Sequence, residues 1–548
     1  MAPGGDPVQA PLTPAALSST GRLVRSSAAV GLGTMLSRLT GLVRVVVLLR
    51  VLGGGGVRFP LAESYNLANT TPNMVYDLLL GGILSATLVP VFVDLVRDDD
   101  DEGISAVVTI AVSALVALTA VTVVAAPWIF RIYTAGKDPA TAHRLASTGV
   151  PLLRFFLPQI LFYGLTALAT ALLNARRSFL APAFAPVLNN VVVVAMLLAL
   201  PTIAGGAVTL RTVLADKVLL TALGAGTTAG IVAMTVVLVP ALRRSGGRLR
   251  VNFDWHHPAL RRVLNLSGWT LGYVVVNQLA FVVITNLATR VSGVTFYANG
   301  FAFFQLPYAL FAVSIMTTFS PDLAAAASGR DFDGFRRRFM LGMRLLLLVI
   351  TPAAAGCFVL ARPLLGAVTL VGGSFKPAEA AVTGDVLGLF ALGLIGFSVY
   401  LYTLRAFYAL KNTRFPFFAA VLQNGMNVLI GLTVFGRFGV QGLAFAYSLS
   451  YSLAAIAALA ALRYRLRRLD AQASAPMIVR TGMAALFMAL WVALLARHVG
   501  GPFGSAAALR VGVGVAAGAA LLWLALTVLR VREVAELTRR LRARVPGL

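Results

Sequence analysis

Residues 182–190 read PAFAPVLNN, and residues 416–424 read PFFAAVLQN. The two stretches align without a gap and share Pro, Phe, Ala, Val, Leu and the final Asn. They begin the fifth and the eleventh predicted helices, so an even number of crossings separates them and both helices run in the same direction. This is the pattern of two parallel bundles related by an axis along the membrane normal. The repeat therefore predicts two similar lobes.

Apolar segments of this kind fill most of the chain. It has 548 residues, of which 58% are hydrophobic and only 12% are charged, whereas soluble domains carry about 25% charged residues. A helix needs about 20 mostly apolar residues to cross a bilayer, and the segments are too long for the strands of a membrane barrel. The sequence therefore predicts an all-α polytopic membrane protein of about fourteen transmembrane helices, with two parallel six-helix lobes and two extra C-terminal helices.

Gly and Pro residues at the segment ends set the approximate helix boundaries. The predicted helices are 28–52, 62–95, 104–132, 146–174, 182–203, 216–242, 264–290, 296–326, 339–361, 378–409, 415–435, 441–463, 477–497 and 507–529. They divide the chain into a disordered cytoplasmic tail at 1–25, an N-terminal lobe at 26–242, a basic cytoplasmic linker at 243–263, a C-terminal lobe at 264–463, two extra helices at 477–529 and a basic cytoplasmic tail at 530–548.

The formal net charge is +26, and the basic residues gather at predicted helix ends. Clusters such as 243–248, 336–338 and 463–468 fall in alternate loops, and the intervening loops carry fewer basic residues. By the positive-inside rule, fourteen crossings put both termini in the cytoplasm. No soluble segment interleaves Lys and Arg with aromatic residues, so we expect this charge to meet anionic membrane lipids and no nucleic acid.

Two arginines lie inside the first predicted helix, where an ionisable side chain is costly and suggests a function. Arg38 and Arg44 are six residues apart, which separates them by about 9 Å along the helix axis and by roughly 120° around it. They cannot share one wall of a pocket, but both can border one broad cavity. Because Arg pairs bidentately with phosphate, such a cavity suits an anionic substrate.

The second predicted helix is too polar to face lipid and contains residues that permit bending. Its candidate substrate-binding residues are Glu63, Asn69, Asn73 and Asp77, and its candidate hinge residues are Pro72, Gly81 and Gly82. We predict that this helix is a bent wall of a water-filled cavity. Glu63 and Asp77 are candidate partners for the two arginines, either within a substrate site or as a purely structural ion pair.

The matching helices of the C-terminal half are polar but uncharged. Asn277, Gln278, Asn424 and Asn427 form a candidate ion or polar site there. The alternative is that these amides join one helix to another, which is the commoner role of such side chains within a membrane. On either interpretation the N-terminal half holds the cationic centre.

Signals for an enzyme or a resident cofactor are missing from the sequence. It contains no H-E-x-x-H, P-loop or G-x-S-x-G motif, and the loop at 243–263 is too short for a catalytic domain. The acidic run at 97–102 is better explained as a solvated loop than as a metal site. We therefore predict a transporter with no cofactor and no metal, driven by an ion gradient, the membrane potential or the substrate gradient.

Several short motifs resemble those of one family of bacterial membrane proteins, in the same order over residues 26–530. They are SRLTGLVR at 37–44, LVPVF at 88–92, FLAPAFAP at 179–186, QLP at 305–307 and RAFYA at 405–409, followed by Pro416. This set is similar to that of the MurJ/MviN family of the MOP exporter superfamily. The resemblance implies a fourteen-helix fold in the bacterial inner membrane and transport of lipid II, the undecaprenyl-pyrophosphate-linked peptidoglycan precursor, by alternating access.

The resemblance also implies roles for particular residues. Arg38 and Arg44 correspond to helix-1 arginines that face the central cavity, and Glu63 corresponds to an acidic residue early in helix 2. The extra helices at 477–529 correspond to a groove for the lipid tail. These roles are expectations from the family.

The chain departs from the family pattern at several cavity positions. Val45 stands where Asp is usual, Tyr76 and Ala302 stand near places where further arginines are usual, and C-terminal carboxylates that bind sodium in some members are Asn or Gln here. The chain is thus predicted to be a divergent member. Its substrate is lipid II or another polyprenyl-linked glycan, and the remaining alternative is a non-transporting scaffold that works with cell-wall synthesis proteins.

Overall fold

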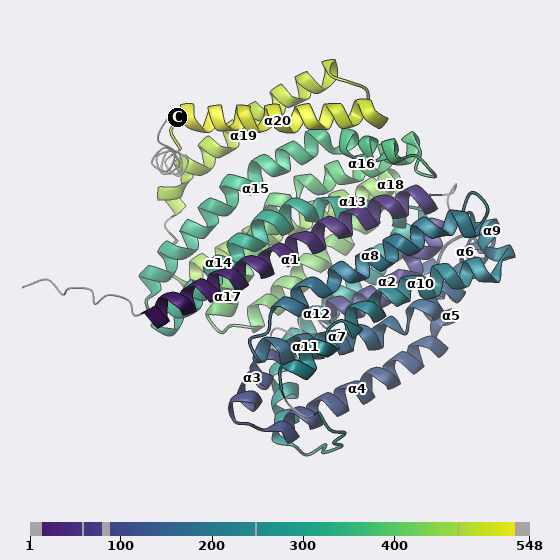
Figure 1. Cartoon of the computed structure of the whole chain (residues 1–548). Coiled ribbons are helices and arrows are strands. Elements are labelled where there is room, and N and C mark those ends of the chain that lie inside the picture. The colour runs from purple at the N-terminus through teal and green to yellow at the C-terminus, as the bar shows by residue number, and fades with distance from the viewer. Residues whose placement is uncertain (1–13, 57–59, 79–87, 247–248, 470, 532–548) are drawn as a thin grey trace, which may run out of the picture.

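The computed structural model describes residues 14–56, 60–78, 88–246, 249–469 and 471–531, and every regular element within these ranges is a helix (Figure 1). The N-terminal half contains α1 (Pro14–Leu52), α2 (Pro60–Leu78), α3 (Val89–Arg97), α4 (Asp101–Val124), α5 (Ala126–Thr134), α6 (Pro139–Phe156), α7 (Gln159–Ala175), α8 (Leu180–Ile203), α9 (Leu210–Ala215), α10 (Lys217–Val236) and α11 (Val239–Arg244). The remainder contains α12 (Pro258–Arg290), α13 (Val294–Pro307), the π-helix η2 (Tyr308–Ala312), α14 (Val313–Ser328), α15 (Phe332–Val368), the 3-10 helix η3 (Thr369–Val371), α16 (Pro377–Leu392), α17 (Leu394–Ala409), α18 (Arg414–Arg465), α19 (Ala471–His498) and α20 (Gly504–Val528).

Proline residues explain why some crossings consist of two consecutive helices. Pro158 precedes α7, and Pro240 lies in the first turn of α11. Proline lacks an N–H group and its ring crowds the preceding turn, so it fits the first turn of a helix and weakens the hydrogen bonding of a helix that precedes it. The pairs α6–α7 and α10–α11 are each long and apolar enough to form one crossing.

Within the described residues, ten helices are long and apolar enough to cross a membrane, or eleven if the bent pair α16–α17 is one span. That count omits α1 and α2. It also takes α18 as one helix, although its 52 residues contain the non-helical Gly439 and would extend about 78 Å at 1.5 Å per residue. The candidate spans of the described residues therefore number ten or eleven, and the count of fourteen crossings stays a prediction. The predicted all-α, multi-span membrane architecture is confirmed.

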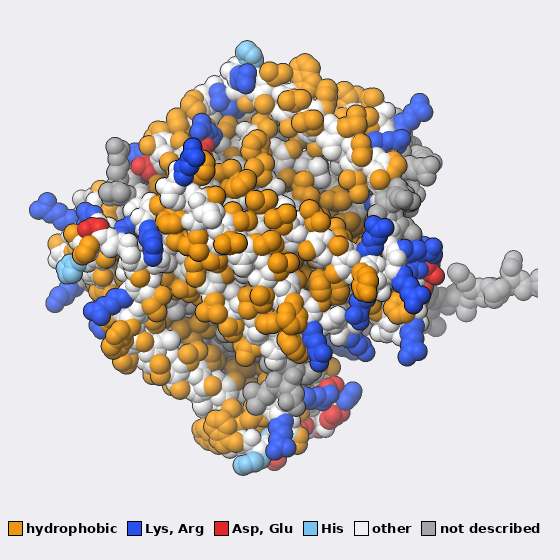
Figure 2. Space-filling model, turned by 180° about the vertical axis from the view of Figure 1, so that it is seen from behind, with side chains coloured by type: hydrophobic (Ala, Val, Ile, Leu, Met, Phe, Trp, Pro, Cys, Tyr) orange, Lys and Arg blue, Asp and Glu red, His pale blue; other side chains and the backbone are white. Residues whose placement is uncertain are grey.

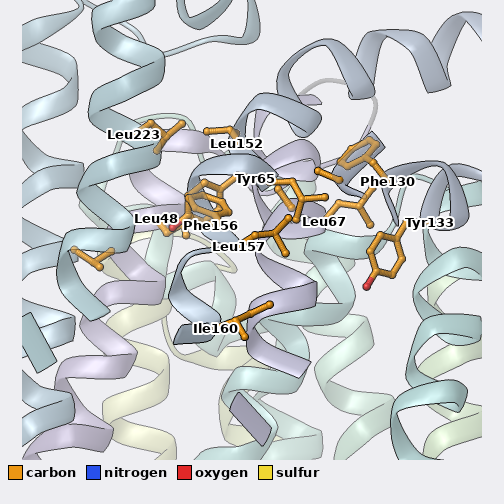
Figure 3. Close-up of a cluster of buried hydrophobic side chains, with 14 of the residues drawn as sticks. Leu48, Tyr65, Leu67, Phe130, Tyr133, Leu152, Phe156, Leu157, Ile160 and Leu223 are labelled. Atoms are coloured by element: carbon orange, nitrogen blue, oxygen red, sulfur yellow. The ribbon is translucent and has the colours of Figure 1, made fainter. Parts of the chain in front are cut away.

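The helices pack around two main hydrophobic cores, one mostly in the N-terminal half and one mostly in the C-terminal half, which we call the two lobes. In the N-terminal lobe α8 packs against α1 and α10, and in the C-terminal lobe α18 packs against α12 and α17. Tyr65 and Phe156 lie in the first core, with ring centroids 5.3 Å apart (Figure 3). Phe304 and Phe390 lie in the second core. Ile284 and Leu287 of α12 belong to the first core and Leu49 of α1 belongs to the second, so apolar packing also joins the two lobes.

The two repeated stretches make equivalent helix–helix hydrogen bonds in the two lobes. Asn190 on α8 donates to the carbonyl of Ser37 and to the hydroxyl of Thr40, both on α1. Asn424 on α18 donates to Oδ1 of Asn277 on α12. In both lobes the last Asn of the repeated stretch thus joins the fifth helix to the first.

The two extra helices lie at one edge of the molecule, where α19 and α20 pack against each other and against α15 (Figure 1). Their other faces are apolar and open, since Leu486, Trp491 and Val515 are each more than half exposed. Figure 2 shows Lys and Arg side chains gathered toward opposite edges of the molecule, with a mainly hydrophobic region between them. This distribution fits a band of protein surface in contact with lipid.

Two predicted boundaries need correction. The sequence predicted a disordered tail over 1–25, but α1 begins at Pro14; residues 1–13 lie outside the described residues. The predicted linker at 243–263 overlaps α12, which begins at Pro258. In both places an apolar-window argument detects only the membrane-crossing part of a helix, and helix-forming residues extend the helix beyond it. The predicted tail at 530–548 lies outside the described residues after Val531.

Candidate functional site

A cavity of 290 Å³ lies between the two lobes, and we call it the arginine cavity. The N-terminal lobe provides most of its wall through α1, α2, α7, α8 and α10: Ser37, Arg38, Gly41, Leu42, Arg44, Val45, Asn73, Tyr76, Tyr163, Pro186, Asn189, Asn190 and Met234. The C-terminal lobe provides Ala302, Gln305 and Leu306 from α13. Both lobes therefore contact whatever occupies this cavity.

Arg38 and Arg44 both line the arginine cavity, with Arg38 exposed and Arg44 half-buried. Among the described residues that line it there is no carboxylate. A guanidinium keeps its charge at any physiological pH, so this part of the interface is cationic. Because guanidinium groups bind phosphate oxygens in pairs, the cavity has the chemistry of an anion site.

Polar side chains beside the arginines complete the wall. The hydroxyl of Tyr163 donates to Oδ1 of Asn73 at 3.3 Å. Asn189 lines the cavity, and its Oδ1 is buried without a hydrogen-bond partner among the described residues, on the side that faces Gly230 of α10. The sequence argument assigned no role to Asn189 or Tyr163, although Asn189 lies in the repeated stretch that opens the fifth helix.

The sequence argument also missed an arginine of the C-terminal lobe. Arg405 on α17 is exposed and interacts electrostatically with Tyr273 on α12 and with Tyr308 in η2. Tyr308 also interacts electrostatically with Arg38, which belongs to the other lobe. Arg405 does not line the arginine cavity, so the prediction that the N-terminal half holds the cationic centre stays a prediction.

Glu63 does not accompany the two cavity arginines, and this corrects the prediction that it would pair with them. It is only 4% exposed, and its two carboxylate oxygens accept hydrogen bonds from the backbone N–H groups of Gly56 and Thr295, at 3.2 and 3.3 Å. Ten residues separate it from Asn73 in α2, which is about 15 Å along a helix axis. Glu63 thus belongs to another part of the interface between the lobes.

That second region is the closed end of the molecule, which we define by the loops at 53–56, 135–138, 291–293 and 372–376. The glycine run at 53–56 passes close to the C-terminal lobe. A Cβ added to Gly55 would lie 2.3 Å from Cβ of Thr295, and the φ of Gly55 is +93°. Only glycine fits such a conformation and such an approach without strain, so the run allows the two lobes to meet.

Further bonds cross between the lobes at the closed end. The Lys137 ammonium donates to the carbonyl of Thr289 and to the hydroxyl of Ser292. Asn286 donates to carbonyl oxygens of the N-terminal lobe, among them that of Ala135 at 3.0 Å. Burial lowers the pKa of Lys137, and the nearby carboxylate of Glu63 opposes that shift. The described contacts of the closed end are therefore hydrogen bonds and close packing between the lobes.

The other predicted residues of α2 divide into several groups. Asn69 is buried and does not line the arginine cavity, unlike Asn73. Pro72 is buried inside α2, which continues as a helix through it. The side chain of Asp77, together with Gly81 and Gly82, lies outside the described residues. The predicted hinge therefore stays a prediction.

The predicted amide group of the C-terminal lobe is not one site. Asn277 and Asn424 bond to each other at 3.1 Å. Gln278 instead reaches the other lobe and donates to the carbonyl of Met74 on α2 at 3.0 Å. Asn427 is buried, and its Oδ1 has no partner among the described residues. These contacts favour the interpretation that the amides join helices, since three of the four bond to a neighbouring helix or lobe.

Known protein sequences resemble this chain over most of its length. The family model described as lipid II flippase MurJ matches residues 58–526. The probable lipid II flippase MurJ of Rhizobium meliloti (strain 1021) is 27% identical over 434 residues, which is 77% of each chain. The lipid II flippase MurJ of Burkholderia cenocepacia is 28% identical over 395 residues, which is 70% of this chain and 72% of the relative.

Solved structures show the same fold. The structure titled "Lipid II flippase MurJ, inward closed conformation" superposes with a TM-score of 0.73 at 20% identity, over 91% of this chain and 98% of the other. An inward-facing multidrug resistance MATE family transporter of the MOP superfamily superposes with a TM-score of 0.65 at 13% identity, over 79% of this chain and 95% of the other. At these identities the likeness concerns the fold alone.

Proposed function

The chain belongs to the MurJ family of lipid II flippases, which are membrane transporters of the MOP superfamily and not enzymes, and we propose that it moves lipid II from the inner to the outer leaflet of the bacterial cytoplasmic membrane. Lipid II carries a pyrophosphate between its polyprenyl chain and its glycan. A flippase must therefore carry two phosphate charges through the membrane, where an unpaired charge is costly.

The observation that supports the proposal best is the arginine cavity, in which Arg38 and Arg44 face the space between the lobes without a described carboxylate beside them. In this proposal their guanidinium groups bind the pyrophosphate oxygens in place of water. Asn73 and Asn189 offer amide groups to glycan hydroxyls. Arg405 of the other lobe interacts electrostatically with Tyr308, as Arg38 does, and adds positive charge to this part of the interface.

The closed end supplies the other half of the mechanism. We infer that it faces outward, with both chain termini in the cytoplasm, so that the arginine cavity receives substrate from the inner leaflet. The two lobes then rock about the bound pyrophosphate, break the contacts of the closed end and release the substrate outward. Each lobe holds most of one of the two main hydrophobic cores, which supports its movement as a unit. The energy source, which is an ion gradient, the membrane potential or the substrate gradient, stays a prediction.

A specific observation favours a second candidate substrate, another polyprenyl-linked glycan. Val45, Tyr76 and Ala302 are the positions at which this chain lacks charges expected from the family, and all three line the arginine cavity. A cavity with fewer charges and an added tyrosine presents a different surface to the glycan, while the two arginines still suit the pyrophosphate that both substrates share.

The test is rescue of peptidoglycan synthesis in cells depleted of their own lipid II flippase. We expect the unmodified chain to restore synthesis and the Arg38→Ala/Arg44→Ala variant to fail at equal abundance in the membrane. Arg50→Ala is the matched control, because Arg50 lies on the same helix, is exposed and does not line the cavity. It should rescue as the unmodified chain does.

The other outcomes separate the alternatives. Full rescue by the double variant would overturn the arginine site and favour a scaffold, whose function does not depend on cavity residues. No rescue by the unmodified chain, with its presence in the membrane confirmed, would overturn lipid II as the substrate and favour the second candidate.

A further inference from the structure

A second large cavity lies away from the interface between the lobes, on the side of the C-terminal lobe that carries the two extra helices. It measures 770 Å³ and is walled by α15, α16, α18, α19 and α20. We call it the lateral pocket. The residues that define its chemistry are Phe358, Arg362, Asp385, Leu389, Arg497 and Arg510. It is large enough for the headgroup and the first chain atoms of a small ligand.

The lateral pocket has an excess of positive charge, because three arginines line it with a single carboxylate. Arg362 pairs with Asp385 through two hydrogen bonds, one of them 3.0 Å between Nη2 and Oδ2. Arg510 donates to the carbonyl oxygens of Val499 and Gly500, at 2.8 and 2.7 Å. Those carbonyls fix its position but leave its charge uncompensated. An anion in the pocket would supply the missing negative charge.

The surroundings of the lateral pocket are apolar and open. Phe358 in its wall is 50% exposed, and the two extra helices carry further exposed apolar side chains, among them Leu494 on α19 and Leu509 on α20, which are 47% and 58% exposed. In a protein that spans a membrane, such surfaces contact acyl chains. A ligand that fits both features therefore joins a negative group to a hydrocarbon chain.

We propose that the lateral pocket binds an anionic phospholipid of the leaflet at the closed end of the protein. Arg497 and Arg510 hold the phosphate oxygens, and Arg362, oriented by Asp385, completes the contact. The acyl chains lie along Phe358 and the exposed leucines of α19 and α20. A free phosphate would gain nothing from that apolar wall, and a neutral lipid would leave the excess charge unpaired. The residues that line this site are all different from those that line the arginine cavity.

The experiment uses the full chain, purified in detergent and titrated with phosphatidylglycerol or with phosphatidylcholine of the same acyl chains, with bound lipid counted by native mass spectrometry. We expect tighter binding of phosphatidylglycerol. The Arg362→Gln/Arg497→Gln variant should lower its affinity about tenfold or more, since charged hydrogen bonds are each worth roughly 1.5 kcal/mol or above. Arg211→Gln, which changes an exposed arginine of α9 far from the pocket, should bind as the unmodified chain does.

A second variant changes affinity in the opposite direction, which a merely misfolded protein would not do. Asp385→Asn removes the carboxylate that competes for Arg362, so phosphatidylglycerol should bind several-fold more tightly. Equal binding of the two lipids, or unchanged binding in the double arginine variant, would overturn the proposal. Displacement of phosphatidylglycerol by millimolar inorganic phosphate would assign the pocket to a free anion and would overturn it as well.

Discussion

The closed end and the arginine cavity are two regions of one interface, and they treat charge in opposite ways. At the closed end the carboxylate of Glu63 is buried. It accepts hydrogen bonds from two backbone N–H groups, that of Gly56 in the adjoining loop and that of Thr295 in the other lobe. In the cavity Arg38 and Arg44 face space with no described carboxylate beside them. A charge whose bonds are satisfied within the protein stabilises one arrangement of the lobes, whereas a charge left open is available to a ligand.

The comparison suggests that stability and binding are separable in this molecule. Changes at the closed end should alter the populations of its states, while changes in the cavity should alter substrate transport. The populations can be followed by the distance between spin labels at 211 and 437, introduced by Arg211→Cys and Arg437→Cys after Cys357→Ser. Both positions are exposed and lie in different lobes.

The largest effect is expected from Gly55→Leu. A side chain there meets Thr295 at 2.3 Å and requires a φ of +93°. The backbone strain is worth about 1–2 kcal/mol, and the crowding is worth about 1–3 kcal/mol. We expect the label distances to shift largely to longer values, with the closed end open. Gly31→Leu is the control, since a side chain at Gly31 meets open space. An unshifted distribution in Gly55→Leu would contradict the tight approach of the lobes.

A smaller effect is expected from Glu63→Ala. This change leaves the N–H groups of Gly56 and Thr295 without their acceptor, which costs about 1–3 kcal/mol for buried groups. The closed population should fall by roughly tenfold relative to the open one, since 1.4 kcal/mol is tenfold in an equilibrium. Glu63→Gln keeps one acceptor oxygen and should lie between the two. The idea fails if the Ala and Gln variants give the same distances as the parent.

The smallest effect is expected from Lys137→Gln. Lys137 is half-buried and bonds to Thr289 and Ser292 of the other lobe, so the loss should be about 0.5–1.5 kcal/mol. The label distances should show a partial increase in the open population. Arg131→Gln, at an exposed residue of α5 in the same lobe, should leave them unchanged. Equal effects of the two substitutions would show that only the loss of a surface charge matters.

Sequence reasoning predicted most of the fold, because crossing a membrane imposes a length and an apolarity that can be read from the chain. The repeated Pro-to-Asn stretch also predicted two similar lobes. Its last Asn bonds to the first helix of each lobe, which is α1 in the N-terminal lobe and α12 in the C-terminal lobe. The family resemblance is confirmed by the match over residues 58–526. The helix boundaries were less predictable, and α1 shows the reason. Its first part, from Pro14 to the predicted start at residue 28, forms a helix because of helix propensity and not because it is apolar.

The candidate site was only partly predictable. Spacing on a helical wheel showed that Arg38 and Arg44 could border one cavity, because two residues of one helix have a fixed relation. The positions of Glu63 and Arg405 could not be found in this way. Glu63 has its partners 7 and 232 residues away along the chain, and Arg405 lies on a helix of the other lobe. Their neighbours depend on how the lobes meet, which no local pattern contains.

The sequence by itself thus determined a helical membrane protein with two repeated lobes, two extra helices and cationic residues within its first helix. Those features follow from periodicity, apolar length and residue type, which act within single segments. The tertiary structure decided which charges meet: Glu63 with backbone N–H groups at the closed end, Arg38 and Arg405 in electrostatic interaction with the same tyrosine, and three arginines in the lateral pocket. The reason is physical, because a charge takes its environment from whatever packs against it, and packing joins residues that lie far apart in the chain.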